Sequence, residues 1–242
     1  MGQRRAPPDY RNDCYYNDWY EIWTRPVKRF NNGRYEKSWT ALMGRHREFD
    51  VEKALDAALC VFWRKGYEGA SYADLTQATG VERPGLYSAF GNKESLFGLA
   101  LNRYYERYLD HFPKALLLPT AREVAAGVIY GAIDVNTRYP DHTGCLGVNG
   151  IVAGSDEAEP VRQMLIEARA AGEALLRERF ERAKAEGDLP ETAKPDVLAA
   201  FVLTLIHGMA VQAKAGFSRD MLRAIAAQAL STWPIGRPGT SG

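Results

Sequence analysis

Three residues near the middle of the chain carry side chains that can bind a metal ion or act in nucleophilic catalysis: Asp141, His142 and Cys145. A zinc site needs three or four ligands, usually from two separated pairs, and a Cys/His nucleophile needs a positioned third group. This cluster has no second ligand pair, and no Walker or dinucleotide-type glycine loop follows a strand in the sequence. We therefore expect no enzyme, no metal site and no cofactor. An enzyme built on these three residues is the weakest alternative.

Composition limits the remaining classes. Apolar residues make up 46% and charged residues 25%, which is typical of a folded globular protein. The three cysteines, Cys14, Cys60 and Cys145, are odd in number and form no CxxC pair, which argues against a disulfide framework. The most apolar stretch, 197–213, is shorter than the about 20 residues of a bilayer span. We therefore expect a soluble protein in the reducing cytoplasm.

Residues 71–90 have the pattern of two short helices joined by a tight turn. Ser71 and Asp74 have the spacing of a capping box, and Gly80 suits a sharp turn between the helices. Leu75 and Phe90 can fix the angle between them. This is the helix-turn-helix geometry, in which the second helix enters the major groove of DNA and the first crosses the backbone. Two helices of an ordinary bundle are the alternative interpretation.

Helical periodicity continues on both sides of this pair, and capping residues and prolines mark the boundaries. We predict an all-α fold. The expected helices span residues 50–66, 71–80, 82–90, 92–112, 120–138, 144–154, 157–185, 195–216 and 218–230.

The segment from Phe62 to Leu96 closely resembles the DNA-binding domain of TetR/AcrR-like bacterial transcriptional regulators. The motifs that carry the resemblance are FWRKGY at 62–67, SYADL at 71–75, ATGV at 78–81, GLY at 85–87 and KESL at 93–96. A weaker resemblance to one C-terminal type of this family covers 144–149, 185–190 and 205–216. Pro84 departs from the family pattern, in which a small or polar residue is more usual.

The resemblance implies a three-helix DNA-binding head with a helix-turn-helix at residues 43–91. It also implies a helical effector-binding and dimerisation body at 92–233, and we expect a mobile tail at 234–242. Residues 1–42 match nothing in the family. They are either a structured extension, with a hairpin around Asn32-Gly33, or sequence upstream of a natural start at Met43.

Several residues of the head are expected to contact DNA. Arg83 at the start of the second helix is the candidate for a base contact to guanine, with a phosphate contact as the alternative. Gly85 is expected to let the backbone approach the groove, and the resemblance places Tyr87 and Lys93 on phosphates. The full expected set is Arg45, Arg47, Ser71, Tyr72, Arg83, Pro84, Gly85, Tyr87, Ser88 and Lys93.

The charge of the head does not by itself explain DNA binding. Residues 43–100 contain seven basic and eight acidic side chains, and the whole chain has a net charge of +1. Binding must therefore depend on directed contacts and on an N-terminal arm in which Arg45 and Arg47 reach a minor groove or a phosphate.

The body is expected to supply a dimer interface and an effector pocket. Two helices with wide apolar faces should pair with their copies, through Leu198, Phe201, Val202, Leu205, Ile206, Met209, Met221, Leu222, Ile225 and Ala229. The expected pocket residues are Tyr104, Tyr108, Phe112, Tyr130, Asn149 and His207.

We therefore expect a homodimeric repressor that leaves a palindromic operator when a small molecule binds, with the fourth helix acting as a lever. A helical interaction module that does not bind DNA is the alternative.

Overall fold

The computed structural model describes residues 49–151 and 154–236, and within these ranges the chain forms helices and no strand. The expected arm residues Arg45 and Arg47, the two alternatives for residues 1–42 and most of the expected tail lie outside the described residues. The α-helices are α3 (Val51–Gly69), α4 (Tyr72–Thr79), α5 (Arg83–Phe90), α6 (Lys93–Tyr108), α7 (His111–Leu116), α8 (Ala121–Arg138), α9 (Leu146–Ile151), α10 (Glu159–Ala185), α11 (Pro195–Lys214) and α12 (Arg219–Ser231); η2 (Pro140–His142) and η3 (Asp156–Ala158) are short 3₁₀ helices.

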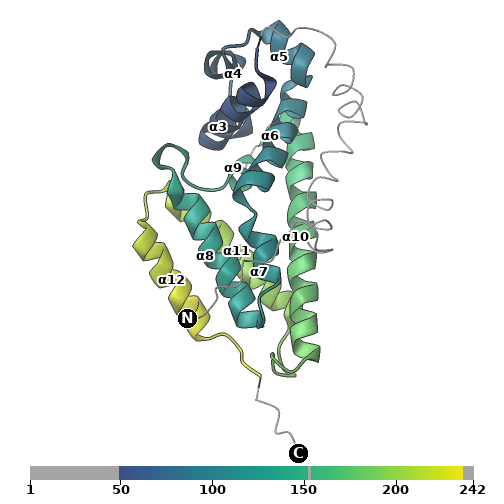
Figure 1. The fold of residues 1–242 in the computed structure, drawn as a ribbon, viewed down its shortest axis with the longest axis vertical. Coiled ribbons are helices and arrows are strands. Elements are labelled where there is room, and N and C mark those ends of the chain that lie inside the picture. The colour runs from purple at the N-terminus through teal and green to yellow at the C-terminus, as the bar shows by residue number, and fades with distance from the viewer. Residues whose placement is uncertain (1–48, 152–153, 237–242) are drawn as a thin grey trace, which may run out of the picture.

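The helices form a small head and a longer body (Figure 1). Helices α3, α4 and α5 make up the head, and α6 leads from it into the body, where α10 runs along the length of the molecule. In the body α11 packs against both α8 and α10, while α12 packs against α8. Helix α9 lies between the two parts and contacts α3, α6 and α10. One short helix therefore touches both the head and the body.

The N-terminal caps of α4 and α8 form as the sequence predicts. The Ser71 hydroxyl accepts from the Asp74 backbone N–H, and the Asp74 carboxylate accepts from the Ser71 N–H, which completes a capping box at α4. Thr120 and Glu123 do the same at α8. Gly80 ends α4 in the left-handed conformation, at φ 67°, which favours glycine. These contacts span at most four residues, so the sequence alone defines them.

The expected helix 92–112 is wrong in one respect, because α6 ends at Tyr108 and a separate short helix, α7, begins at His111. Pro113 explains the break, since a proline ring clashes with the carbonyl four residues before it, here that of Leu109. Within α7 the proline occupies the first turn, where a missing N–H costs no intrahelical bond.

Two other expectations hold only in part. Gly66 has a φ of 73°, so the regular part of α3 ends there as expected, and one further turn reaches Gly69. The tail was expected to be mobile from Pro234, but the Gly236 N–H donates to the Asp188 carbonyl at 2.8 Å. Trp233 packs against Phe180, with ring centroids 5.4 Å apart. The chain is therefore anchored to the body through Gly236.

Helix α11 is the one described helix that is long and apolar enough to cross a membrane, with a mean hydropathy of 1.6 over its most apolar window. Core helices of soluble proteins pass the same test of length and composition. Here one side of α11 is covered by α8 and α10, while Val197, Phe201 and Val211 remain exposed. Packing within one chain therefore covers only part of the apolar surface of α11.

The contact between α7 and α8 buries an ionisable ring. His111 packs directly on Gly131, where an added Cβ would lie 2.1 Å from the His111 ring. Burial lowers the pKa of His111 to about 4, although the Tyr108 carbonyl acts in the opposite direction. The imidazole is therefore neutral at pH 7.

This burial predicts a loss of stability in mild acid. The folded-state pKa lies below the unfolded value of about 6.5, so the unfolded chain takes up the proton first and the free energy of unfolding falls as pH decreases from about 6.5 towards 4. The loss due to this one group is at most about 3 kcal/mol. Urea denaturation of wild type and His111→Gln across this range should show a shallower decline for the variant. Parallel curves would contradict the assignment.

Candidate DNA interface and effector cavity

Helix α5 lies at the end of the head (Figure 1), and several of its residues are exposed. Arg83, Pro84 and Ser88 are exposed, and Tyr87 is 40% exposed. The opposite side of the helix, with Leu86 and Phe90, is buried in the head. The helix therefore has one face fixed by packing and one face free to enter a groove, as expected for a reading helix.

Arg83 is held in place by two tyrosines. Its guanidinium lies 4.0 Å from the ring centroid of Tyr72, and its NH2 group donates to the Tyr87 hydroxyl at 3.3 Å. Tyr72 also donates to Tyr87 at 2.7 Å, and the hydrogen bond from Arg83 lowers the pKa of Tyr87. An exposed cation–π contact contributes about 0.5–1 kcal/mol, less than the about 1–3 kcal/mol of a bidentate guanine contact. A suitable base can therefore outcompete this resting position.

The start of α4 offers backbone rather than side-chain donors to a phosphate. The Ser71 hydroxyl donates to Asp74 at 2.8 Å, so its only proton is already engaged. Among the described residues no acceptor pairs with the backbone N–H groups of Tyr72 and Ala73, which lie in the first turn of the helix. Lys65 forms an ion pair of 2.6 Å with Asp74 and offsets the acidic charge at this end. A phosphate here would bind these N–H groups.

Gly85 has a packing role that the sequence analysis did not predict. A Cβ at this position would point inward and meet Val81 Cγ1 at 2.8 Å, with the Phe49 ring at 3.9 Å. Glycine thus allows α5 to pack closely against the preceding turn, and its close approach to DNA stays a prediction. Pro84 lies in the first turn of α5, where proline is compatible with the helix.

Lys93 begins α6 and is half-buried. Its ammonium lies 4.6 Å from the ring centroid of Tyr67, and burial lowers its pKa while Glu68, Glu157 and Asp74 oppose that effect. Contact with a phosphate would require the side chain to leave the Tyr67 ring.

A cavity in the body is enclosed by residues from α6 to α11. Its volume is about 80 Å³, and it has an open mouth. Its lining is mainly apolar, and its polar members are Tyr104, Tyr105, His111, Asn136, Cys145, Arg169 and His207.

Three of the six expected pocket residues line this cavity: Tyr104, Phe112 and His207. The other three do not. The Tyr108 ring packs against Trp63 at 4.9 Å, Tyr130 lies under the guanidinium of Arg223, and Asn149 bonds to the backbone of the head. The sequence shows which residues are apolar or aromatic, but not which side of each helix faces the cavity.

Arg169 is the main cavity residue that sequence reasoning missed. It lies on the long charged helix α10, where an arginine is usually a solvated surface residue. The available signal was its spacing, because Arg169 follows the buried Leu165 by four residues and precedes the buried Gly172 by three. Cys145 was considered only as part of an enzyme, and the structure instead places it in the cavity wall while Asp141 is exposed.

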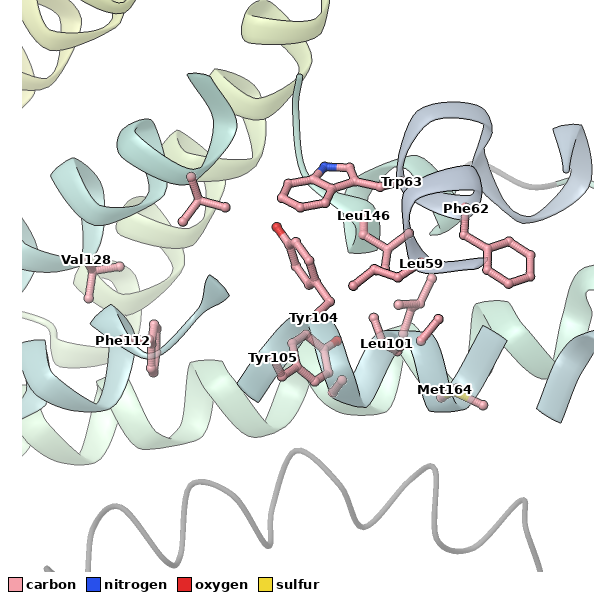
Figure 2. Close-up of a cluster of buried hydrophobic side chains, with 14 of the residues drawn as sticks. Leu59, Phe62, Trp63, Leu101, Tyr104, Tyr105, Phe112, Val128, Leu146 and Met164 are labelled. Atoms are coloured by element: carbon pink, nitrogen blue, oxygen red, sulfur yellow. The ribbon is translucent and has the colours of Figure 1, made fainter. Parts of the chain in front are cut away.

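The segment that forms one wall of the cavity also holds the head. The Trp63 indole N–H donates to the Gly144 carbonyl at 2.7 Å, and the Asn149 amide donates to the Trp63 carbonyl at 3.0 Å. Figure 2 shows Trp63 from α3 close to Tyr104 from α6 and Leu146 from α9. We call these two hydrogen bonds and this aromatic contact the Trp63 clasp.

A second set of contacts strengthens the connection between head and body. The Glu68 carboxylate accepts from the backbone N–H groups of Gly154 and Ser155. On the other side of α3, Arg103 of α6 pairs with Glu52 and Asp56. The head is thus tied both to α6 and to the segment that includes α9.

The expected dimer residues divide into groups. Val202, Met209 and Leu222 are fully buried in the core of their own chain, so an interface role for them is wrong, and Ile206 lines the cavity. Phe201 and Met221 are exposed, and Leu198, Leu205, Ile225 and Ala229 are half-buried. The apolar residues predicted from the sequence as one wide face therefore lie on two sides of each helix. One side packs inside the chain, and the other remains exposed.

One face of each helix carries a regularly spaced set of exposed residues. On α11 this face includes the exposed Val197, Phe201, Thr204, Gly208 and Val211, and on α12 it includes the exposed Met221, Ala224 and Gln228. The spacing of three and four residues makes each set a continuous helical stripe. We call these residues the α11–α12 stripe.

Comparisons with known proteins agree with this arrangement. The family described as "Bacterial regulatory proteins, tetR family" matches residues 54–100, and the "Tetracyclin repressor-like, C-terminal domain" matches residues 126–229. The chain is 34% identical to the HTH-type transcriptional repressor ComR of Escherichia coli K12 over 79% of this chain and 92% of that protein. It is 29% identical to the repressor BdcR of the same strain, over 80% and 93%.

A solved structure provides the same comparison in three dimensions. A cysteine-substituted variant of the regulator CifR, bound to 26-base-pair operator DNA, is 40% identical, with a TM-score of 0.74 over 78% of this chain and all of that one. Sequence and fold agree over both head and body. The chain therefore belongs to the TetR family of bacterial transcriptional regulators.

Proposed function

We propose that the protein is a cytoplasmic homodimeric repressor that binds a palindromic operator through α5 and releases it when a small molecule occupies the body cavity. The observation that carries the proposal is the outward face of α5, with Arg83 positioned by Tyr72 and Tyr87. The repressor assignment is supported by the names of ComR and BdcR, and operator binding by the CifR complex.

The proposed dimer uses the α11–α12 stripe. Val197 and Phe201 are 55% and 42% exposed. Contact between these apolar side chains and water is unfavourable, and a partner that covers them would remove it. Two-fold pairing of these helices would form a four-helix interface and place two heads on one side of the assembly. The reading helices would then lie about 34 Å apart, one turn of B-DNA.

The proposed signal passes from the cavity to the head through the Trp63 clasp. Cys145 and Val148 line the cavity, while Gly144 and Asn149 in the same segment bind Trp63. A ligand that shifts this segment must also shift α3, on which α4 packs. This adds a second route to the lever action expected of α6, which remains tied to α3 through Arg103.

The alternative is a helical module that no longer binds DNA, and selection from a random DNA pool separates the two. A palindromic consensus supports the repressor, whereas folded protein that enriches no sequence favours the module.

The operator obtained in this way tests Arg83. Arg83→Ala should weaken binding by about 5- to 150-fold, the equivalent of about 1–3 kcal/mol, and should relax the preference for one base pair in each half-site. Fluorescence anisotropy at fixed salt measures this, with Arg177→Ala on the exposed side of α10 as the charge-matched control. If affinity for unrelated DNA falls by the same factor, Arg83 contacts a phosphate instead.

The dimer interface can be tested independently of DNA. Phe201→Glu introduces a charge into the α11–α12 stripe and should give monomers that remain folded, because the side chain is 42% exposed within one chain. Ile166→Glu on α10, at a position 38% exposed, is the matched control and should leave the dimer intact. Sedimentation equilibrium gives the masses. A dimeric Phe201→Glu protein would disprove the proposed interface.

The Trp63 clasp predicts a local change in dynamics. Asn149→Ala removes a partly buried hydrogen bond worth about 1 kcal/mol, so amide hydrogen exchange in residues 61–69 should accelerate by about fivefold. Exchange in α12 should stay as in wild type. Gln163→Ala, on the exposed side of α10, serves as the control. Unchanged exchange in 61–69 would show that the clasp does not hold the head.

A further inference from the structure

The chemistry of the cavity points to a class of effector. Most of its wall is hydrocarbon or aromatic, contributed by side chains such as Leu109, Phe112 and Leu165. An apolar lining of this kind favours a ligand with an apolar body, because burial of that body removes apolar surface from water. The few polar groups then decide which ligand binds.

Arg169 is the one charged residue in this lining, which contains no Asp or Glu. Burial lowers its pKa, opposed by its interactions with Cys145 and Tyr105. Its guanidinium is nonetheless charged at pH 7, since arginine keeps its proton in proteins. Within residues 49–151 and 154–236, no carboxylate forms an ion pair with Arg169, and its guanidinium donates no hydrogen bond.

A second arginine on the inner side of α10 shows what a structural arginine looks like in this protein. Arg179 donates to the backbone carbonyls of Leu116, Leu118 and Pro119 at 2.8–3.1 Å, and it fastens the loop before α8. Arg169 has no such set of acceptors. The two residues lie on one helix, so their different surroundings reflect what each faces: a loop for Arg179 and a cavity for Arg169.

His207 lies beside Arg169 in the cavity wall. Burial lowers the pKa of His207 to about 4, and the positive charge of Arg169 acts in the same direction. A neutral imidazole next to a guanidinium adds a hydrogen-bonding group without a second positive charge. The site can thus balance one negative charge, which fits a carboxylate better than a doubly charged phosphate.

We propose that the effector is a small, mainly apolar molecule bearing a single carboxylate, with its body in the cavity and its carboxylate paired with Arg169. Only the regulatory role of this ligand rests on the proposed function, because binding to the cavity can be measured without DNA. It names the ligand chemistry and the residue that selects it.

Matched pairs of probes test the proposal. Phenylbutyrate and octanoate are compared with their primary amides, which have the same shape and no charge, by isothermal titration calorimetry with the full-length dimer. Each acid should bind wild type at least about tenfold more tightly than its amide, the gain expected from a charge-assisted hydrogen-bonded pair. In Arg169→Gln this preference should disappear. In Arg169→Lys, which keeps the charge, part of it should remain.

The control is Arg177→Gln, two turns further along α10, where the arginine pairs with Glu181 in solvent at 3.7 Å. This variant should retain the wild-type preference. The proposal is overturned if acids and amides bind equally, if neither acid binds, or if the preference survives in Arg169→Gln. A separate measurement of operator binding distinguishes the two conclusions, since specific DNA binding without acid preference refutes only the ligand class.

Discussion

The hydrogen bond from the Trp63 indole to the Gly144 carbonyl is the contact on which the relation between head and body depends. Trp63 is 1% exposed, and it packs edge-on against Tyr104 and Tyr108 of α6. A buried indole N–H without an acceptor would cost about 1–3 kcal/mol, so the Gly144 carbonyl must stay within reach for α3 to keep its place. The position of the reading helix is therefore tied to the backbone of the cavity wall.

Several other contacts act together with this hydrogen bond to hold α3 in place. The aromatic cluster of Figure 2 fills the junction between α3, α6 and α9, so that movement of one helix requires repacking of the others. Arg103 holds α3 through Glu52, and the backbone N–H groups of Gly154 and Ser155 hold it through Glu68. These contacts position the head, and the proposed effector must supply enough differential binding energy to displace a packed interface.

The sequence allowed prediction of the local features of the site, and the long-range ones required coordinates. Helix starts at Ser71 and Thr120 follow from residues three positions apart, and the helix-turn-helix follows from a short run of residues. The inward orientation of Gly85 and the division of the apolar faces of α11 depend on partners far away in the chain. Arg169 was missed for the same reason, because only the positions of α6 and α11 show that it faces a cavity.

The measurement that tests this account most directly is the distance between the two reading helices of the proposed dimer, from electron paramagnetic resonance with a genetically encoded spin label at Ser88. On operator DNA the account predicts a narrow distribution near about 34 Å. Trp63→Phe keeps the aromatic ring but loses the bond to Gly144, so without DNA its distribution should be broader than that of wild type. Identical distributions for the two proteins would contradict the claim that the Trp63 clasp positions the head.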